Sequence, residues 1–182
     1  LGDVYKGPKV TNARTAVSWL KVDAVETDSL LSGSAWTVST GSDHSARSWT
    51  VKDNDGSPSY TCTASDPTSS TDTTGVLCDT DTTAGQFTVE GLSYGSTSGT
   101  SYSLTEKAAP DGYVKSDTEY SFTIDADGKT SAITYEDSSG HSHTTDGRIT
   151  NAKAITALPR TGAWWTGRTM EIIGVALVAL AG

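Results

Sequence analysis

The stretch "TAVSWLKVDA", residues 15–24, alternates between apolar and polar positions with a period of two. Val17, Trp19 and Lys21 share one face, and the residues between them form the other face. This alternation is typical of a β-strand with one face in a core. The stretch therefore predicts a strand near the start of a folded domain. It also places a lysine among the residues that point inward.

Similar short runs follow this strand, separated by turn signals rich in Gly, Pro, Asn and Asp. We expect further strands at 35–40, 44–53, 85–95, 100–114, in a hairpin over 119–137 around "ADGK", and at 148–154. No segment before residue 163 has a convincing 3.6-residue period. About eight short strands with turns every ten residues or so predict an all-β fold, an antiparallel Ig-like β-sandwich over residues 14–153. Residues 53–85 are the least regular part, and we expect a decorated loop there.

Composition narrows the class of protein. The chain has 182 residues, 35% of them hydrophobic, a net charge of −9 and a pI near 4.6. An acidic chain without basic clusters is a poor nucleic-acid binder, and its charge suits a solvated extracellular surface. We find no phosphate-binding loop, nucleophile elbow or CxxC motif. We therefore expect no enzyme and no cofactor. His141 and His143 in "HSH" are more typical of a solvated loop than of a metal site.

The two cysteines, Cys62 and Cys78, lie in a polar, turn-rich segment. In an exported protein such a pair predicts a disulfide, worth roughly 3 kcal/mol by chain entropy. The alternative is two unrelated buried thiols. A zinc site is disfavoured, because the additional Cys or His ligands that zinc needs are missing.

Three polar residues share the inward parity of their strands. Lys21 follows Trp19, Glu106 follows Leu104, and Asn151 follows Ile149. One explanation is a buried Lys–Glu ion pair with the Asn alongside, and another is that all three reach water at strand ends. The third is chemical. Burial favours a neutral lysine and a protonated glutamate, so Lys21 could attack the Asn151 amide while Glu106 polarises its carbonyl and shuttles the proton. An amide would then form with loss of ammonia.

The segments "WLKVDA", "LLSGSAWTV", "GQFTVEGLSYG", "YSLTEKAAPDGY" and "ITN" together resemble the Cna B-type, prealbumin-like domains of Gram-positive pilins and adhesins. The resemblance spans roughly residues 15–152. It implies a spontaneous isopeptide bond between Lys21 and Asn151, promoted by Glu106. The longer 53–85 region, with its two cysteines, departs from the family pattern. "PKVTN" at 8–12 is similar to "RITN", so residues 1–13 are interpreted as a linker or the end of a preceding domain, with Asn12 in the equivalent place.

After the last strand, "AITALPRTG" shows no periodicity and predicts an extended linker over 154–162. The motif consists of Leu158, Pro159, Arg160, Thr161 and Gly162. Two tryptophans and an apolar run follow, over residues 163–182. This run is interpreted as the start of a truncated transmembrane helix, because a bilayer span needs about 20 residues. The alternative is a buried C-terminal helix of the sandwich.

"LPRTG" followed by an apolar segment resembles the cell-wall sorting signal of Gram-positive surface proteins. The resemblance implies that sortase cuts between Thr161 and Gly162 and joins Thr161 to a peptidoglycan precursor or a neighbouring pilin. We therefore expect an extracellular stalk domain attached to the cell wall, whose precursor sits in the membrane through its C-terminal segment. The alternative is an adhesin module that binds a host surface protein or glycan through residues 53–85. An anchored enzyme would need a catalytic domain upstream.

Overall fold

The computed structural model describes residues 15–40, 47–62, 77–92 and 99–155. It has nine strands: β1 (Ala16–Asp23), β2 (Ala35–Thr40), β3 (Arg47–Lys52), β4 (Gln86–Glu90), β5 (Thr100–Ala108), β6 (Glu119–Ile124), β7 (Thr134–Glu136), β8 (Ser142–Thr144) and β9 (Arg148–Asn151). Within these ranges no helix occurs, and none is long and apolar enough to cross a membrane. The sorting motif, the apolar tail and Asn12 lie outside the described residues.

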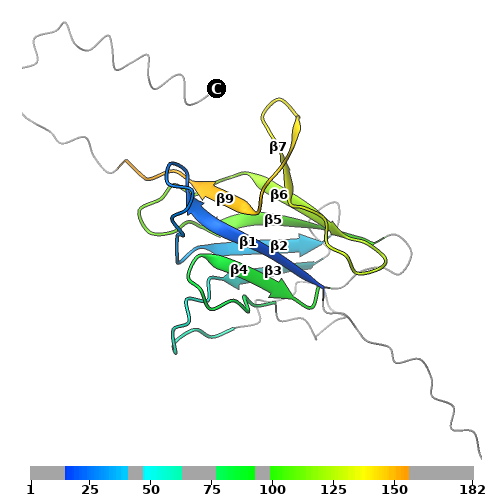
Figure 1. Cartoon of the computed structure of the whole chain (residues 1–182), viewed down its shortest axis with the longest axis horizontal. Helices are drawn as coiled ribbons and strands as arrows, with labels where there is room; N and C mark the ends of the chain where they lie inside the picture. Colours follow the sequence, from blue (N-terminus) through cyan, green and yellow to red (C-terminus); the bar gives the residue numbers. More distant parts are fainter. Residues whose placement is uncertain (1–14, 41–46, 63–76, 93–98, 156–182) are drawn as a thin grey trace, which may run out of the picture.

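The strands form two sheets that face each other (Figure 1). One has the order β4-β1-β9 and the other the order β3-β2-β5-β6-β7-β8. The prediction of an all-β sandwich is confirmed. The expected antiparallel pairing is wrong for one pair, because β1 and β9 run parallel, whereas the other strand pairs are antiparallel. Parallel neighbours need a long crossover connection, which here is nearly the whole domain.

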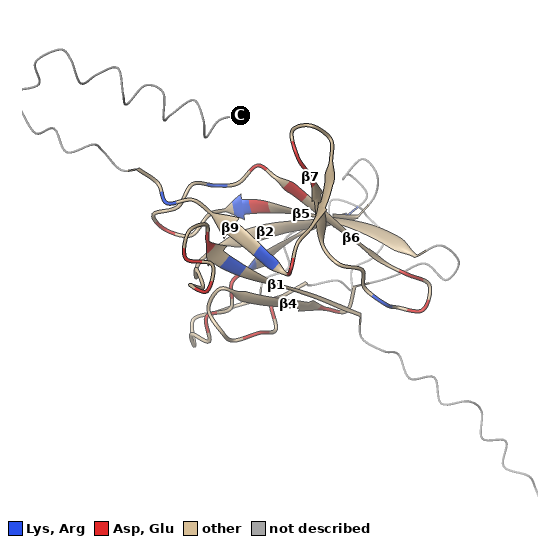
Figure 2. Ribbon diagram, turned by 45° about the horizontal axis from the view of Figure 1, so that its top comes forward, with Lys and Arg blue, Asp and Glu red and all other residues tan. Residues whose placement is uncertain are grey.

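The inward face of β1 contributes directly to the core between the sheets. Trp19 stacks on Phe87 of β4 with ring centroids 4.8 Å apart, and Trp36 of β2 meets Trp19 edge-on at 5.7 Å. The first pair lies within the small sheet and the second joins it to the large one. Each aromatic contact adds to the burial of apolar area. The expected period of two is confirmed from Val17 to Lys21, since Val17, Trp19 and Lys21 are buried while Ser18 is exposed. It ends there, because Val22 is buried as well. Charged positions lie mostly in the loops (Figure 2).

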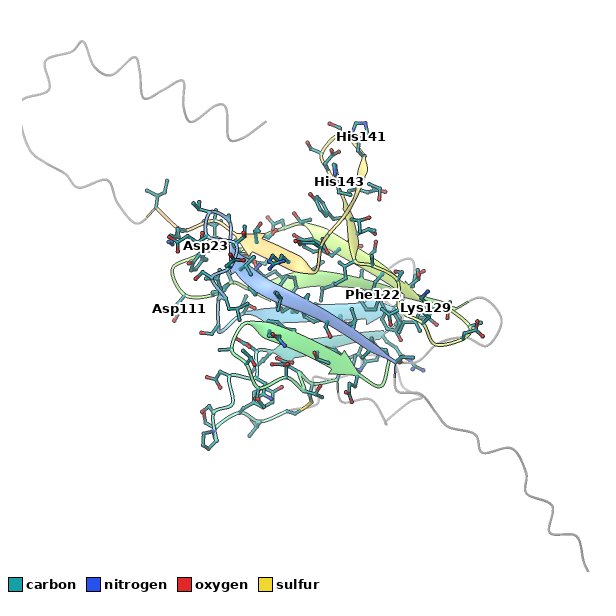
Figure 3. All side chains as sticks on the ribbon, in the orientation of Figure 1. Asp23, Asp111, Phe122, Lys129, His141 and His143 are labelled. Carbon is teal, nitrogen blue, oxygen red and sulfur yellow. A yellow bond between two sulfur atoms is a disulfide. The ribbon has the colours of Figure 1, made fainter. Side chains whose placement is uncertain are left out.

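The segment 138–147 contains a strand that its polar composition does not predict. β8 pairs with β7, and the two form a hairpin that projects from the sheet with His141 and His143 on it (Figure 3). Asp137 closes this turn by accepting the His141 N–H at 2.9 Å, and its Oδ2 lies 2.9 Å from His143 Nε2. The contact with His143 and the backbone N–H groups that Asp137 accepts lower the pKa of Asp137 to about 2. Because both faces of β8 are exposed, its sequence has no apolar alternation.

The 53–85 region is irregular in its described parts, as its sequence predicts. The disulfide between Cys62 and Cys78 is present, with Cα atoms 5.7 Å apart. Two carboxylates, the half-buried Asp53 and the buried Asp79, organise the flanking turns. Asp53 accepts the N–H groups of Gly33 and Gly85 at 2.7 and 3.0 Å. Asp79 accepts three backbone N–H groups, and burial raises its pKa to about 6.

Candidate functional site: a buried lysine, glutamate and asparagine

Lys21, Glu106 and Asn151 come from three strands and meet inside the sandwich. β1 and β9 supply Lys21 and Asn151 from the small sheet, and β5 supplies Glu106 from the facing sheet. Their exposed fractions are 0%, 2% and 3%. The interpretation in which these groups reach water at strand ends is therefore wrong. Lys21 lies two residues before the end of β1, Glu106 two residues before the end of β5, and Asn151 at the end of β9, which places all three near the ends of their strands.

Each of the three side chains contacts the other two. Lys21 Nζ lies 3.0 Å from Glu106 Oε1 and donates a hydrogen bond to Asn151 Oδ1. Asn151 Nδ2 donates to both carboxylate oxygens of Glu106, at 3.0 and 2.9 Å. The amine is thus beside the amide carbonyl, and the carboxyl is beside the amide nitrogen. This differs from the mechanism suggested by the sequence, in which Glu106 polarises the carbonyl oxygen.

A backbone carbonyl fixes the orientation of the Asn151 amide. Asn151 Nδ2 donates to the Val114 carbonyl oxygen at 3.0 Å. A carbonyl oxygen has lone pairs only, so the face of the amide that meets it must carry hydrogens. The opposite orientation would set two oxygens against each other. The amide nitrogen therefore points at Val114 and Glu106, and the carbonyl oxygen points at Lys21.

The surroundings favour an uncharged amine. Burial lowers the pKa of Lys21, and the hydrogen bond and charge of Glu106 oppose this effect. Lys21 Nζ also lies 4.9 Å from the centroid of the Trp36 ring, a contact that likewise favours the charged amine and opposes the effect of burial. Apolar surroundings cost a charged lysine its hydration, and the neutral form is the nucleophile. The site combines an amine, an amide carbon within its reach and a carboxyl that can carry a proton between the two nitrogens.

A second polar cluster beside the site went unrecognised in the sequence. Asp23, two residues after Lys21, is 2% exposed and accepts a hydrogen bond from Tyr113 Oη at 2.9 Å. Lys153 Nζ lies 3.3 Å from the same carboxylate oxygen. The backbone N–H groups of Val25 and Glu26 also donate to Asp23, and all these contacts hold its pKa well below the usual range. The parity of β1 was a signal for its burial, but no local pattern indicates its partners.

Other candidate ligands are less organised. Among the described residues, no three His, Cys, Asp or Glu side chains come together as a metal site. A small cavity of about 200 Å³ lies next to the disulfide. It is lined by Thr50, Lys52, Tyr60, Thr61, Cys62, Leu77 and Lys107. Lys107 Nζ donates to Thr50 Oγ1 at 2.8 Å, so one of its two lysine amines is held in place.

The fold and the buried cluster define a prealbumin-like β-sandwich. A family model described as "SpaA: Prealbumin-like fold domain" matches residues 15–139, more than half of the chain. The chain belongs to this family. It is similar to a solved structure of a BcpA variant, the major pilin subunit of Bacillus cereus, with 19% identity and a TM-score of 0.35. That match covers 78% of this chain and 29% of the pilin. No curated protein matches.

Proposed function

We propose that this chain is a structural stalk domain of a cell-wall-anchored surface protein, cross-linked internally between Lys21 and Asn151. The observation that carries the proposal is the buried contact of Lys21 with both Glu106 and Asn151. Membership in a prealbumin-like family supports a structural role. In this proposal the chain is not an enzyme, since the only reaction occurs once, within the molecule.

The chemistry balances without a cofactor. Neutral Lys21 Nζ attacks Asn151 Cγ, and the Nζ–Cγ bond forms as the Cγ–Nδ2 bond breaks. Glu106 takes the proton from Nζ and delivers it to Nδ2, which leaves as ammonia, so the carboxyl ends as it began. The contacts of Nδ2 with both oxygens of Glu106 support this proton path. Fixed proximity in the fold replaces the binding step of an enzyme.

The position of the bond suits a load-bearing role. β1 and β9 are parallel neighbours, so the start of β1 and the end of β9 lie at opposite ends of the domain (Figure 1). Tension between these points would pull the two strands past each other. Their ladder is short, with four residue pairs. A covalent link between Lys21 and Asn151 would carry this tension from strand to strand, so the ladder hydrogen bonds would bear little of it.

The attachment to the cell wall is proposed on sequence alone. Thr161 follows Ile155 by six residues, which span at most about 20 Å. Sortase would cut after Thr161 and transfer it to a peptidoglycan precursor or to a neighbouring pilin. The protein would then be extracellular, and residues 163–182 would hold its precursor in the membrane before sorting.

Intact mass of the full chain tests the cross-link. We expect wild-type protein to be about 17 Da lighter than its sequence because ammonia is lost, besides about 2 Da for the disulfide. The Glu106→Ala variant should have the full mass of its sequence apart from the disulfide, because without the carboxyl that carries the proton no ammonia is lost. A wild-type mass without this deficit would leave Lys21 and Glu106 as a buried ion pair and would refute the cross-link.

A second candidate function is an adhesin module. The cavity beside Cys62, with two lysines and a tyrosine in its lining, favours a small anionic group of a host protein or glycan as ligand. The stalk and adhesin functions are compatible. Whether the protein is a pilin subunit or a singly anchored adhesin is tested by the size of the protein on the bacterial surface. A pilin gives a ladder of covalent high-mass species that disappears without its sortase, whereas a singly anchored adhesin gives none.

A further inference from the structure

The segment from Pro110 to Ser116, here called the clasp, lies against the buried cluster and contacts Glu106 and Asn151. Its backbone pairs with the chain that leaves β9. Val114 N–H donates to the Ala152 carbonyl at 2.9 Å, and Ala154 N–H donates to the Gly112 carbonyl at 2.8 Å. The clasp therefore binds the three residues that follow Asn151.

Two backbone groups of the clasp reach the reacting side chains. Ser116 N–H donates to Glu106 Oε2 at 2.7 Å, and the Val114 carbonyl accepts from Asn151 Nδ2 at 3.0 Å. Each contact removes one rotational freedom. The first holds Oε2 of the carboxyl, and both carboxylate oxygens accept from the amide nitrogen. The second turns the amide so that its oxygen faces the lysine.

A side chain of the clasp fastens it to β1. Tyr113 Oη donates to Asp23, which lies at the end of β1 opposite Asn151 in the parallel register. Asp23 is buried, and its other oxygen accepts the backbone N–H groups that follow β1. Figure 3 shows Asp23 and Asp111 at the same end of the domain. Lys153, in the chain that leaves β9 (here called the exit chain), adds a contact to the same carboxylate. Asp23 thus ties the clasp, β1 and the exit chain together.

We propose that the clasp is the positioning element of the isopeptide reaction, holding the Glu106 carboxyl and the Asn151 amide in the reactive orientation. This rests on the cross-link proposed above. An unclasped Asn151 could rotate about its Cβ–Cγ bond, and its nitrogen would then lose the carboxyl that delivers the proton. Reaction would therefore follow closure of the clasp, so only a completely folded domain would become cross-linked.

The test measures the rate of cross-linking in the full chain. Cell-free translation is stopped after a short pulse, samples are quenched in SDS at intervals, and the fraction about 17 Da lighter is followed by intact mass. Ser116→Pro removes the backbone N–H that donates a hydrogen bond to Glu106. Tyr113→Phe removes the hydroxyl that donates a hydrogen bond to Asp23. Lys115→Ala is the matched control, since its side chain is 47% exposed and, within the described part of the chain, pairs with the solvent-exposed Asp117.

We expect Ser116→Pro to slow mass loss roughly tenfold to a hundredfold, as removal of a hydrogen bond to a charged group does. Tyr113→Phe should slow it roughly tenfold on the same grounds. Ser116→Ala retains the N–H and should restore most of the rate. Lys115→Ala should match wild type. The stability of each substitution is measured separately in a Glu106→Gln background, where no cross-link forms. A substitution that slows the reaction but leaves this stability unchanged acts on positioning and not on folding.

The outcomes separate the two proposals. A wild-type chain without mass loss removes the cross-link itself. If wild type reacts and Ser116→Pro reacts equally fast, only the role of the clasp is overturned. It is also overturned if Ser116→Pro lowers the thermal midpoint of the Glu106→Gln background by more than about 10 °C, because slow reaction would then follow from poor folding.

Discussion

Replacing Glu106 by Gln should prevent the proposed cross-link between Lys21 and Asn151 while preserving the shape of the buried cluster. The glutamine carbonyl oxygen still accepts a hydrogen bond, but the side chain cannot carry a proton from Lys21 to Asn151. Lys21 and Asn151, the two residues of the proposed cross-link, are 130 positions apart. Closing a loop of that length lowers the entropy of the unfolded chain, which stabilises the fold by about 5 kcal/mol in the chain-entropy model. The amide nitrogen that replaces one carboxylate oxygen cannot accept, so the two contacts of that oxygen are lost, which adds about 2 kcal/mol.

The assay is thermal unfolding followed by circular dichroism, with intact mass measured on the same samples. A loss of about 5 kcal/mol corresponds to a fall in the thermal midpoint of roughly 10 to 20 °C for a domain of this size. Glu136→Gln is the matched control, because Glu136 is an exposed carboxyl on β7. Surface substitutions of this kind change stability by less than about 0.5 kcal/mol.

The reasoning is refuted if wild type carries the mass deficit and Glu106→Gln does not, yet their thermal midpoints agree within about 3 °C. Loop closure would then contribute nothing measurable, and the benefit of the bond would be mechanical alone. A Glu106→Gln chain that still loses ammonia would instead show that the carboxyl is dispensable for proton transfer.

Three further predictions concern the rest of the domain. Replacing Cys62 and Cys78 by Ser should cost about 3 kcal/mol in denaturant unfolding, because the bridge closes a loop of 16 residues; a change below about 1 kcal/mol would contradict this. Asp79 titrates at about pH 6 when folded, above its ordinary 3.8, so the folded state binds this proton more tightly than the unfolded state. Its contribution to stability is therefore lost as pH rises from about 4 to 7, and carboxyl ¹³C NMR should give a midpoint near 6; a midpoint near 4 would be inconsistent. Gly85 and Gly91 both have positive φ, but a Cβ at Gly85 would meet backbone atoms at 2.8 Å and one at Gly91 would meet none. Gly91→Ala should cost about 1 kcal/mol and Gly85→Ala about 3 kcal/mol or more in chemical denaturation, and equal costs would argue against the close approach.

The burial of the three site residues could be predicted because side-chain direction in a strand is a local property. Val17 and Trp19 place Lys21 inside once β1 is accepted as a strand, and Leu104 and Ile149 do the same for Glu106 and Asn151. The same rule covers Asp23, whose burial was available from the parity of β1 but was not used. The period of two also predicted the sandwich, because the same alternation recurs in several short runs separated by turn signals.

The sequence could not supply the contacts among these residues. The parallel pairing of β1 with β9 joins segments about 130 residues apart, and nothing local sets its register. β8 was not predicted, because both of its faces are exposed and its sequence lacks apolar alternation. It is a strand because it pairs with β7 and because Asp137 closes the turn between them.

The sequence by itself determined which side chains enter the core, where the turns lie and that two cysteines share one irregular region. Only the tertiary structure decided that Glu106 faces the nitrogen of the Asn151 amide and that the backbone of Val114 and Ser116 orients both groups. The physical reason is that a backbone carbonyl or N–H is the same in every residue. Its role depends on where the chain brings it, which no pattern of side chains records.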